Sequence, residues 1–336
     1  MKNDFFALAE EQRRIVIEQA AVRHNLSKQA VEKDLWVSAM LQILFSLPCA
    51  ESMVFKGGTS LTKGWGLINR FSEDIDVAID RSIFGLDGDL TKKQVKKLRK
   101  ESSLFVKDIL FRQISEKVTQ FKLNDWCEIE AQPDGTGDNT YPEPRTIFVK
   151  YHSVFADKIP YISPDVKIEV GARSLLEPTT DIKISSLIES ALSAISTTII
   201  DVPVRTAIAE KTFLEKAFLL HELFSVREDE PAKRRSRHLY DLHMMMQKGL
   251  AEKAIKDDEL WETIHYHRAS LTSMQGVDYS SDFRDRIKLV PPAKCIKDWQ
   301  RDYEDMAVSM IYKNPPAFST LLESMEKLES IFKNRK

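Results

Sequence analysis

Two aspartates alternate with apolar residues over the segment 74–79, whose sequence is Asp-Ile-Asp-Val-Ala-Ile. Successive side chains of a strand point to opposite faces of its sheet, so the branched residues would be buried while Asp74 and Asp76 share the other face. Two carboxylates placed in this way repel each other unless a divalent cation binds between them. The segment therefore predicts a strand with one buried face and one Mg²⁺-binding face, with a solvated strand edge as the alternative.

Glycines gather just upstream of this strand. Of the 11 glycines in the 336-residue chain, four lie between residues 57 and 66, which indicates a special backbone geometry there. Gly57-Gly58-Thr59-Ser60 joins a short strand pattern at 53–56 to a helical pattern at 59–68, and free amides at a helix start suit a phosphate. The spacing matches neither a Walker loop nor a dinucleotide-binding loop, which disfavours a kinase or an NAD enzyme. An ordinary strand–turn–helix corner is the alternative.

A second strand pattern, residues 166–170, carries a further acid. Its apolar residues would face the core, whereas Lys167 and Glu169 would point the opposite way. An acid on one strand beside an acid pair on another is how a two-metal phosphoryl-transfer centre is assembled. Glu169 is therefore predicted to join the acid pair.

The charge balance excludes one class of function and leaves another open. The chain has 49 basic and 51 acidic residues, a formal net charge of −2. That balance excludes a globally basic nucleic-acid-binding protein but not a local basic patch. The densest basic run is Lys233-Arg234-Arg235-Ser236-Arg237-His238. It is a candidate nucleic-acid contact, with a solvated loop and a helix start capped by Ser236 as the alternative.

Several features bear on the cellular compartment. No apolar stretch is long enough to cross a membrane, and the first residues lack the apolar core of a signal peptide. The three cysteines, Cys49, Cys127 and Cys295, are odd in number and far apart, which is typical of reduced thiols. We therefore expect a soluble cytoplasmic protein.

Helix and strand patterns are mixed up to about residue 200 and are only helical after Pro203. Two domains are therefore expected, residues 1–200 and 201–336. A long charged helical stretch is expected over 90–121, with Ser102-Ser103 as the place for a break. Paired strands are expected at 123–131 and 145–151, and later helices at 205–224, 236–248, 251–267 and 316–334.

Taken in chain order, six motifs resemble those of the AbiEii/AbiGii nucleotidyltransferase toxins, effectors of bacterial abortive-infection and toxin–antitoxin systems. They span roughly residues 32–242 and are Glu32-Lys33-Asp34-Leu35-Trp36, 54–63, 70–76, 166–173, 212–217 and 237–242. The resemblance implies an α+β fold. A polymerase-beta-like nucleotidyltransferase domain with a mixed sheet, residues 1–200, would be followed by a C-terminal helical domain, residues 201–336, that completes the active site.

The resemblance also implies how the nucleotide is held. In this superfamily the glycine turn binds the phosphates, a role that falls here on Gly57-Gly58-Thr59-Ser60. Lys63, one helical turn further on, would add charge to the triphosphate, with a solvated helix lysine as the alternative. Ser72 and Arg70 would support the acid strand or touch phosphate.

Catalytic roles follow from the same resemblance. Asp74 and Asp76 would bind Mg²⁺, and Glu169 would be either a third metal ligand or the base that deprotonates the attacking hydroxyl. In the helical domain, Lys216 matches the family's Phe-x-Glu-Lys and would reach a phosphate from beside an apolar helix stripe; Lys211 is the competing lysine. Asp241 matches the family's essential acid and would orient Lys216 or the nucleotide, with a helix aspartate of no special role as the alternative.

The implied reaction transfers a nucleoside monophosphate from an NTP to an acceptor and releases pyrophosphate, with Mg²⁺ as cofactor. The 3′ end of a tRNA is the favoured acceptor, and the family alone implies toxicity and a cognate antitoxin. Two alternatives stay open. One is a protein-nucleotidylating enzyme with the same NTP site, and the other is a nucleotide- or RNA-binding module without turnover.

Overall fold

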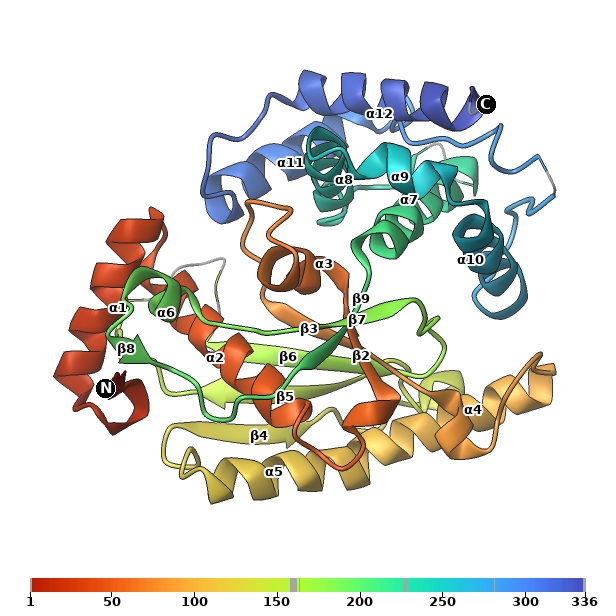
Figure 1. The fold of residues 1–336 in the computed structure, drawn as a ribbon. Helices are drawn as coiled ribbons and strands as arrows, with labels where there is room; N and C mark the ends of the chain where they lie inside the picture. The colour runs from red at the N-terminus through yellow and green to blue at the C-terminus, as the bar shows by residue number, and fades with distance from the viewer. Residues whose placement is uncertain (1, 158–161, 163, 227–228, 281, 335–336) are drawn as a thin grey trace. The chain divides into compact units, whose positions relative to one another are not determined.

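Strands of the first 207 residues build one mixed sheet in the computed structural model (Figure 1). They are β2 (Met53–Lys56), β3 (Asp74–Ile79), β4 (Cys127–Ala131), β5 (Arg145–Tyr151), β6 (Asp165–Gly171), β7 (Thr179–Ile182) and β9 (Val204–Ala207). Their order is β4-β5-β6-β3-β2-β9-β7, which puts β3 in the middle, parallel to β6 and antiparallel to β2. Two short strands, β1 (Asn3–Asp4) and β8 (Ile195–Ser196), pair with each other separately.

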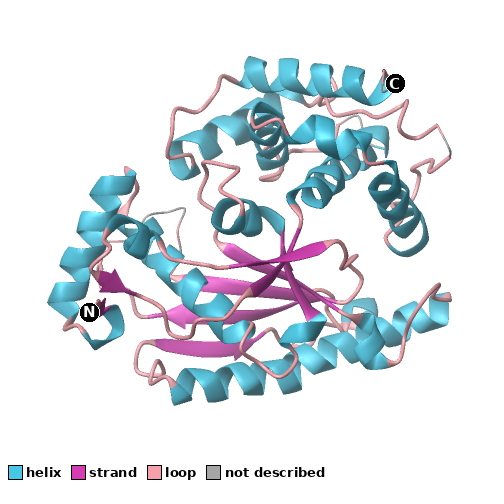
Figure 2. Cartoon of the chain, viewed as in Figure 1, coloured by secondary structure: helices cyan, strands magenta, loops and turns pink. Residues whose placement is uncertain are grey.

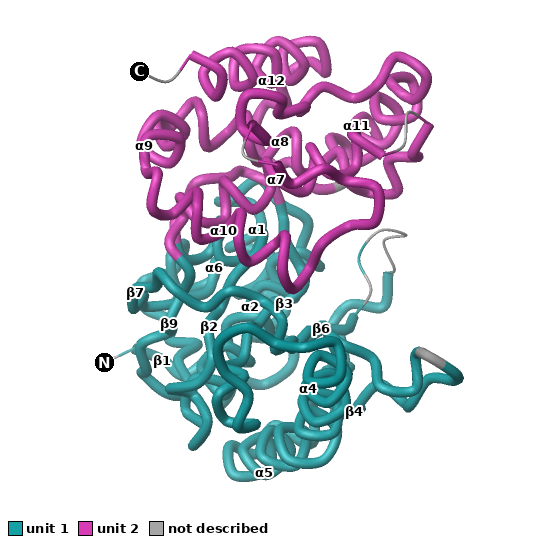
Figure 3. The backbone as a smooth tube through the Cα atoms, turned by 90° about the vertical axis from the view of Figure 1, so that its right-hand side faces the viewer, with its two compact units in different colours: residues 1–64, 71–207 teal, residues 65–70, 208–336 magenta. Residues whose placement is uncertain are grey.

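The chain divides into two units, which Figure 3 shows in teal and magenta. Unit 1 comprises residues 1–64 and 71–207, and unit 2 comprises residues 65–70 and 208–336. The structure describes every residue except 1, 158–161, 163, 227–228, 281 and 335–336. Unit 1 combines helices with the mixed sheet, and unit 2 is built of helices (Figure 2), so the predicted α+β fold class is confirmed.

Three of the helices of unit 1, those that share a core cluster with β3, bury the apolar face of the sheet. The helices of this unit are α1 (Glu10–His24), α2 (Lys28–Leu44), α3 (Gly57–Thr59), α4 (Lys92–Leu104), α5 (Phe111–Gln120) and α6 (Leu187–Ala191). Side chains of α2, α4 and α5 share one core cluster with Ile75, Val77 and Ile79 of β3, each of which is almost inaccessible to water. Burying each of these side chains contributes roughly 1.5–3 kcal/mol, which fixes the face that β3 turns inward.

The opposite face of β3 is polar at one end and apolar at the other. Asp74 and Asp76 are half-buried there, while Ala78 packs with Val54 and Ala207 in a small apolar cluster. This is the alternation that the sequence predicts for the strand. The acid pair therefore lies on a rigid, central part of the sheet.

Unit 2 surrounds an aromatic core. Its helices are α7 (Ala209–Val226), α8 (Arg237–Gln247), α9 (Leu250–Lys256), α10 (Asp258–Leu271), α11 (Ile296–Met310) and α12 (Phe318–Lys333). The Phe218 ring lies 4.5 Å from that of Trp261 and 4.9 Å from that of Phe283, measured between centroids. Such aromatic pairs contribute about 0.5–1.5 kcal/mol each beyond the burial of their area. They hold α7, which carries Lys216, against the neighbouring elements of the unit.

The prediction that strands end at Pro203 is wrong. β9 pairs in parallel with β2 and antiparallel with β7, so the sheet continues into residues that were expected to begin a helix at 205. The signal is the two-residue alternation of Val204 and Thr206, both fully buried. It is too short to stand out beside the strongly helical composition that follows.

Helical stretches are also divided differently from the expectation. The stretch 90–121 is continuous, and its irregular part is a π-helical turn, η5 (Phe105–Leu110), rather than a break at Ser102-Ser103. The expected helix 251–267 is two helices, because Asp257 ends α9 and caps α10 by accepting a bond from the Leu260 amide (2.9 Å). Helix α11 was not expected.

Among the described residues, no helix has both the length and the apolar character that a membrane crossing requires. The thiols of Cys49, Cys127 and Cys295 are all free.

Candidate active site

The three predicted acids lie on one face of the central sheet. β3 and β6 run in parallel, with Asp76 opposite Glu169 and Asp74 opposite Lys167. Residues directly opposite each other on neighbouring strands point to the same face. Asp74, Asp76 and Glu169 therefore share the face that is turned away from the main core, and each is half-buried.

These carboxylates lack the partners that buried acids normally have. No described residue donates a hydrogen bond to the side chain of Asp74, Asp76 or Glu169, and none forms an ion pair with them. Burial raises the pKa of Asp74, the charge of Glu73 adds to the rise, and Lys167 opposes it. Burial also raises the pKa of Glu169, with Asp76 and then Asp74 adding to the effect. Crowded carboxylates without donors are the environment that a bound cation relieves.

Gly57 brings the glycine turn into direct contact with the acid strand. Its φ angle is +80°, a conformation that side-chain-bearing residues rarely adopt. A Cβ atom at this position would lie 2.1 Å from Asp76 Oδ2, which is closer than any real contact. Only glycine therefore allows the turn and the Asp76 carboxylate to touch. The turn continues as α3 into a π-helical turn, η3 (Ser60–Gly64). The Ser60 amide bonds the Gly57 carbonyl, so the amides without intrahelical acceptors are those at the start of α3.

The hydroxyl groups of the turn are used inside the protein. Thr59 Oγ1 lies 2.9 Å from Ser72 Oγ and donates to the backbone carbonyl of Asp74. Ser60 Oγ donates to the carbonyl of Gly57 (2.8 Å). Both Thr59 and Ser60 are fully buried. Thr59 thus ties the turn to the acid strand and Ser60 closes the turn on itself. The backbone is therefore the part of the turn that is suited to a ligand.

Helix α2 contributes charges for which the residue pattern alone assigned no role. Lys63 Nζ lies 2.5 Å from Asp34 Oδ1, and the other oxygen of Asp34 accepts a bond from the Leu187 amide (2.7 Å). Lys33 Nζ lies 2.6 Å from Glu73 Oε2, beside the acid strand. Lys33 and Asp34 are buried, although they are charged. The available signal was a run of three charged residues inside an otherwise apolar helix.

A second cluster of predicted residues lies within unit 2. Arg70 donates to both oxygens of Asp241, from Nε (2.7 Å) and from Nη2 (2.8 Å). Lys216 Nζ lies 2.9 Å from Asp241 Oδ2 and 3.3 Å from His238 Nδ1. Asp241 and Arg70 are buried, and Lys216 is nearly so. The structure therefore brings Lys216 and Asp241 together and adds Arg70, which the sequence placed beside the acid strand.

Electrostatics in this cluster differ from those of the acid strand. Burial by itself would raise the pKa of Asp241, but Arg70 and Lys216 together hold it far below its usual range. Burial lowers the pKa of Lys216, and Asp241 opposes that effect. The pKa of His238 is well below its usual value, because it is buried and faces Lys216 and Arg237. The cluster is thus a neutralised network around one ionised carboxylate.

Lys211, the competing lysine, has a different environment. Its side chain is fully buried, and its Nζ lies 3.4 Å from Glu215 Oε1, one turn further along α7. Of the two lysines, only Lys216 is beside Asp241.

A residue of α11 fixes the backbone of the basic run, residues 233–238, through hydrogen bonds. Lys233 and Arg234 both have positive φ angles, 43° and 65°, which are unfavourable for residues with long side chains. The amide of Arg234 donates to Asp302 Oδ1 (2.6 Å), and the amide of Ser236 donates to Asp302 Oδ2 (3.1 Å). Ser236 lies at the predicted N-cap position of α8, but its hydroxyl bonds Asp302 instead of capping the helix. Lys233, Arg234 and Arg237 are exposed.

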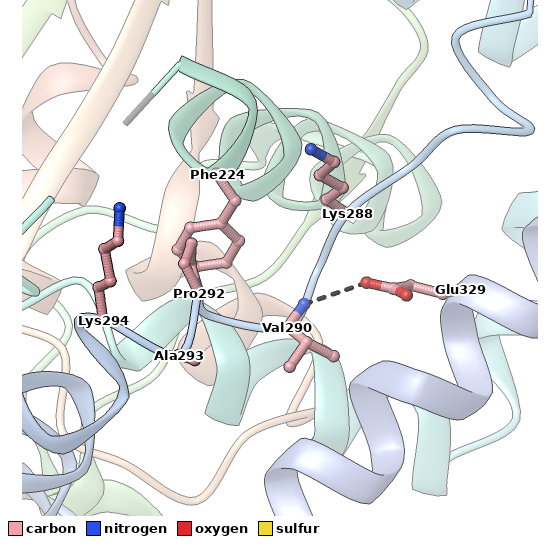
Figure 4. Close-up of a pocket in the computed structure, with 7 residues that line it drawn as sticks. All are labelled: Phe224, Lys288, Val290, Pro292, Ala293, Lys294 and Glu329. Atoms are coloured by element: carbon pink, nitrogen blue, oxygen red, sulfur yellow. Dashed lines mark hydrogen bonds between the residues drawn. The ribbon is translucent and has the colours of Figure 1, made fainter. Parts of the chain in front are cut away.

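A pocket of about 370 Å³ opens elsewhere in unit 2 (Figure 4). Glu329 shapes it by accepting bonds from the amides of Leu289 (2.6 Å) and Val290 (3.1 Å). None of the residues that line it is a predicted site residue. They are Phe224, Lys288, Val290, Pro292, Ala293, Lys294 and Glu329.

The acid strand fits a magnesium ion only in part. Mg²⁺ binds through one or two carboxylates and completes its six ligands with water and substrate phosphates. Asp74 and Asp76 supply two such carboxylates without competing donors. Within the described parts of the chain, however, no three histidine, cysteine or acidic side chains come close enough together to hold an ion. The donor set therefore suits a metal that arrives with its nucleotide.

Comparison with known proteins gives a family and a fold. The family model described as "Nucleotidyl transferase AbiEii toxin, Type IV TA system" matches residues 40–324. Among solved structures, the chain resembles MenT4, a nucleotidyltransferase toxin of Mycobacterium tuberculosis, at 16% sequence identity and a TM-score of 0.58. That match covers 98% of this chain and 91% of MenT4. No curated protein matches the sequence.

Proposed function

The chain belongs to the AbiEii family of nucleotidyltransferase toxins of type IV toxin–antitoxin systems, and on that basis we propose that it transfers a nucleoside monophosphate from an NTP to the 3′ end of a tRNA. The reaction depends on Mg²⁺ and releases pyrophosphate. A cognate antitoxin is part of such a system, and the reaction takes place in the cytoplasm, where NTPs and tRNA are found. We also propose that this protein acts in abortive infection.

The crowding of Asp74, Asp76 and Glu169 on one sheet face carries this proposal. Half-buried acids without donors are costly in a protein that never binds a cation. Mg²⁺ held there would neutralise the charge that builds up on the phosphates during transfer. The proposed reaction therefore accounts for three acids whose burial is unfavourable in the free protein. A binding module without turnover would not need all three.

The three acids have separate roles in the proposed reaction. Asp74 and Asp76 hold the metal together with oxygens of the NTP. Glu169, whose pKa is raised, removes the proton from the attacking 3′-hydroxyl. The hydroxyl oxygen then forms a bond to the α-phosphorus, the bond to the bridging oxygen of the β-phosphate breaks, and pyrophosphate leaves. Glu169 as a third metal ligand is the alternative.

The remaining predicted residues bind the nucleotide. The turn Gly57-Gly58-Thr59-Ser60 holds the phosphates, to whose oxygens its free backbone amides donate. Ser72, which accepts a bond from Thr59, keeps the turn in register with the acid strand. Lys63 contacts the triphosphate after its ion pair with Asp34 is replaced by one with a phosphate oxygen. Lys216, oriented by Asp241, binds a phosphate of the same nucleotide.

The basic run supports RNA as the acceptor. Its exposed cations, Lys233, Arg234 and Arg237, are displayed by a loop that Asp302 holds in one shape. Preorganised cations suit the regularly spaced phosphates of a nucleic acid. A protein acceptor has no such requirement and is the second candidate.

The decisive test is incubation of the protein with each α-labelled NTP, Mg²⁺ and total tRNA. We expect label from one NTP in tRNA, in a band that is lost with EDTA and lost in Asp76→Asn. Glu128→Gln, an exposed acid on β4 of the same sheet, is the matched control and should behave as wild type. Label in protein instead of RNA would establish the second candidate. No label in any macromolecule, despite measurable NTP binding, would leave only the binding module.

A further inference from the structure

Two lysines lie directly beside the acid pair on the strands that flank it. Lys167 of β6 is the register partner of Asp74, and Lys56 of β2 is the register partner of Asp76. Side chains in such positions share one face, with Cβ atoms about 5 Å apart. Both lysines are half-buried. The acid face therefore carries cations as well as carboxylates.

Lysines near the predicted site fall into two kinds. Lys33, Lys63 and Lys216 are buried and paired with a carboxylate at 2.6, 2.5 and 2.9 Å. Lys167 and Lys56, by contrast, make neither a hydrogen bond nor an ion pair with any residue that the structure describes. A buried pair must be broken before its lysine can bind a ligand, and that is costly. Lys167 is available without such a loss.

Lys167 also lies between two of the acids of this face. It lies across from Asp74 and is two residues from Glu169 on its own strand, so its charge acts on both acids and opposes the rise in their pKa values. Lys56 acts on Glu169 alone of these two. Asp74 and Asp76 would hold the metal of an incoming NTP, and a lysine at this position would then be beside the phosphates.

We propose that Lys167 is a substrate-binding residue: in the free protein its charge acts as the counter-ion of Asp74 across the sheet without a direct ion pair, and in the complex it binds a phosphate oxygen of the NTP. The second half of this inference rests on the proposed function, whereas the first half does not. The lysine that the turn motif offers, Lys63, would then serve mainly to hold Asp34 and α2 in place. Lys167 has no existing pair to break before it binds a phosphate; Lys56 shares that property, but only Lys167 of the two lies across from Asp74.

The first experiment is a double-mutant cycle on the free protein, measured as the melting temperature in EDTA. Lys167→Met keeps the length of the side chain and removes its charge. We expect it to lower the melting temperature of wild type by about 2–4 °C, the size of shift produced by the loss of one favourable charge pair in a domain of this size. In an Asp74→Asn background the same substitution should have almost no effect. Equal shifts in both backgrounds would overturn the counter-ion role.

A matched control tests whether any lysine of the sheet would behave in this way. Lys150 of β5 lies on the same face but pairs with Glu130 at 2.6 Å, two strands away from the acid pair. Lys150→Met should shift the melting temperature equally in the presence and absence of Asp74→Asn. Lys167→Arg, which keeps the charge, should restore the coupling, and it provides a second variant if Lys167→Met does not fold.

The second experiment measures binding of a non-hydrolysable NTP with Mg²⁺ by calorimetry. Lys167→Met should weaken binding about 10-fold or more, because a hydrogen bond between two charged groups is lost. Lys167→Arg should recover much of it, and Lys150→Met should bind as wild type does. Unchanged binding by Lys167→Met would overturn the phosphate contact. If wild type itself binds no NTP, the proposed function fails, and the cycle in EDTA still decides the counter-ion role.

Discussion

The acid strand of unit 1 and the Asp241 network of unit 2 both remove carboxylates from water, but they treat the charge in opposite ways. Asp241 is buried with two cations that hold its pKa far below the usual range. Asp74 and Glu169 are half-buried without donors from any described residue, and their pKa values are raised. The charge of Asp241 is therefore neutralised by ion pairs within the protein, whereas the charges of Asp74 and Glu169 are not.

This difference separates two uses of a buried acid. A satisfied network resists change, because removing one partner leaves an uncompensated charge in the interior. An unsatisfied cluster is destabilising until a ligand binds, so removing one of its charges relieves repulsion. Substitutions in the two regions should therefore differ in the sign of their effect on stability, even where both abolish function.

The largest expected effect is on activity at the acid strand. Asp74→Asn or Asp76→Asn should reduce nucleotide transfer by at least about 10³-fold, on the scale of losing a principal electrostatic element of an active site. The melting temperature should stay level or rise, because the mutual repulsion is relieved. Labelled-NTP assays and thermal unfolding in EDTA measure the two quantities. Near-normal transfer in either variant would contradict the metal assignment.

The second prediction concerns stability in the Asp241 network. Arg70→Met leaves a buried carboxylate with one partner fewer and should lower the free energy of unfolding by about 3–5 kcal/mol, as measured in urea. Arg286→Met is the control in the same unit, since Arg286 pairs with Asp282 at the surface and its loss should cost no more than about 1 kcal/mol. Equal losses in the two variants would show that the network is not a stabilising centre.

A third prediction separates the two lysines of α7. Lys216→Ala should lower kcat/KM for the NTP by about 10–100-fold, the range for losing a hydrogen bond to a charged group. Lys211→Ala should change stability but not NTP use, because Lys211 is buried against Glu215. Steady-state kinetics over a range of NTP concentrations measures both. The reverse ranking would place Lys211, and not Lys216, in the site.

The fourth prediction asks whether unit 2 carries a surface for nucleic acid beside its network. Four contacts from Lys233, Arg234, Arg235 and Arg237 to RNA phosphates imply a slope of roughly −3 to −4 for log affinity against log salt. Neutralising Lys233 and Arg234 together should flatten that slope by about 1–2 and leave NTP affinity unchanged. Asparagine is the suitable replacement, because it tolerates the positive φ angles at both positions. An unchanged slope would favour the protein acceptor.

The smallest expected effect is a pH dependence that distinguishes the two carboxylate regions. For Asp74 and Glu169 the folded pKa is raised, so ionising them costs stability, and that cost disappears as pH falls through the raised pKa values. In EDTA, the stability of wild type should therefore approach that of Asp74→Asn as the pH falls from neutral into the acid range, through the raised pKa values. Asp241 has a lowered pKa, so its contribution persists over this range and is lost only in stronger acid. A gap between the two proteins that does not narrow would contradict the assignment.

Local patterns predicted the part of the site that lies within single strands. The alternation in β3 and β6 identified the exposed face and the three acids, because burial of branched residues determines which side chains point outward. The pairing of Asp76 with Glu169 needed the register between two strands that are far apart in sequence, and no local pattern encodes that register. The resemblance to a known family supplied Lys216 and Asp241, which periodicity alone does not distinguish from ordinary helix residues.

Long-range ion pairs were the main omission. Arg70 reaches Asp241 across 171 positions in the sequence, and Asp34 reaches Lys63 across 29. Charged residues of these kinds are usually exposed, so none of them by itself indicates that it is buried. They are removed from water only by the packing of the helices and loops that carry them. Strand β9 was missed for a related reason, since its four residues owe their conformation to pairing with β2 and β7 and not to their own propensity.

The contact between Gly57 and Asp76 has a consequence for genetics. A side chain at position 57 would displace the Asp76 carboxylate before it altered the binding of any phosphate, because the space for its Cβ is already occupied by Asp76 Oδ2. In a selection for cells that survive expression of the toxin, we therefore expect substitutions of Gly57 and of Asp76 to form one phenotypic class. A compensating change for a Gly57 allele should be sought on β3 and its neighbours, and not among the residues that contact the nucleotide.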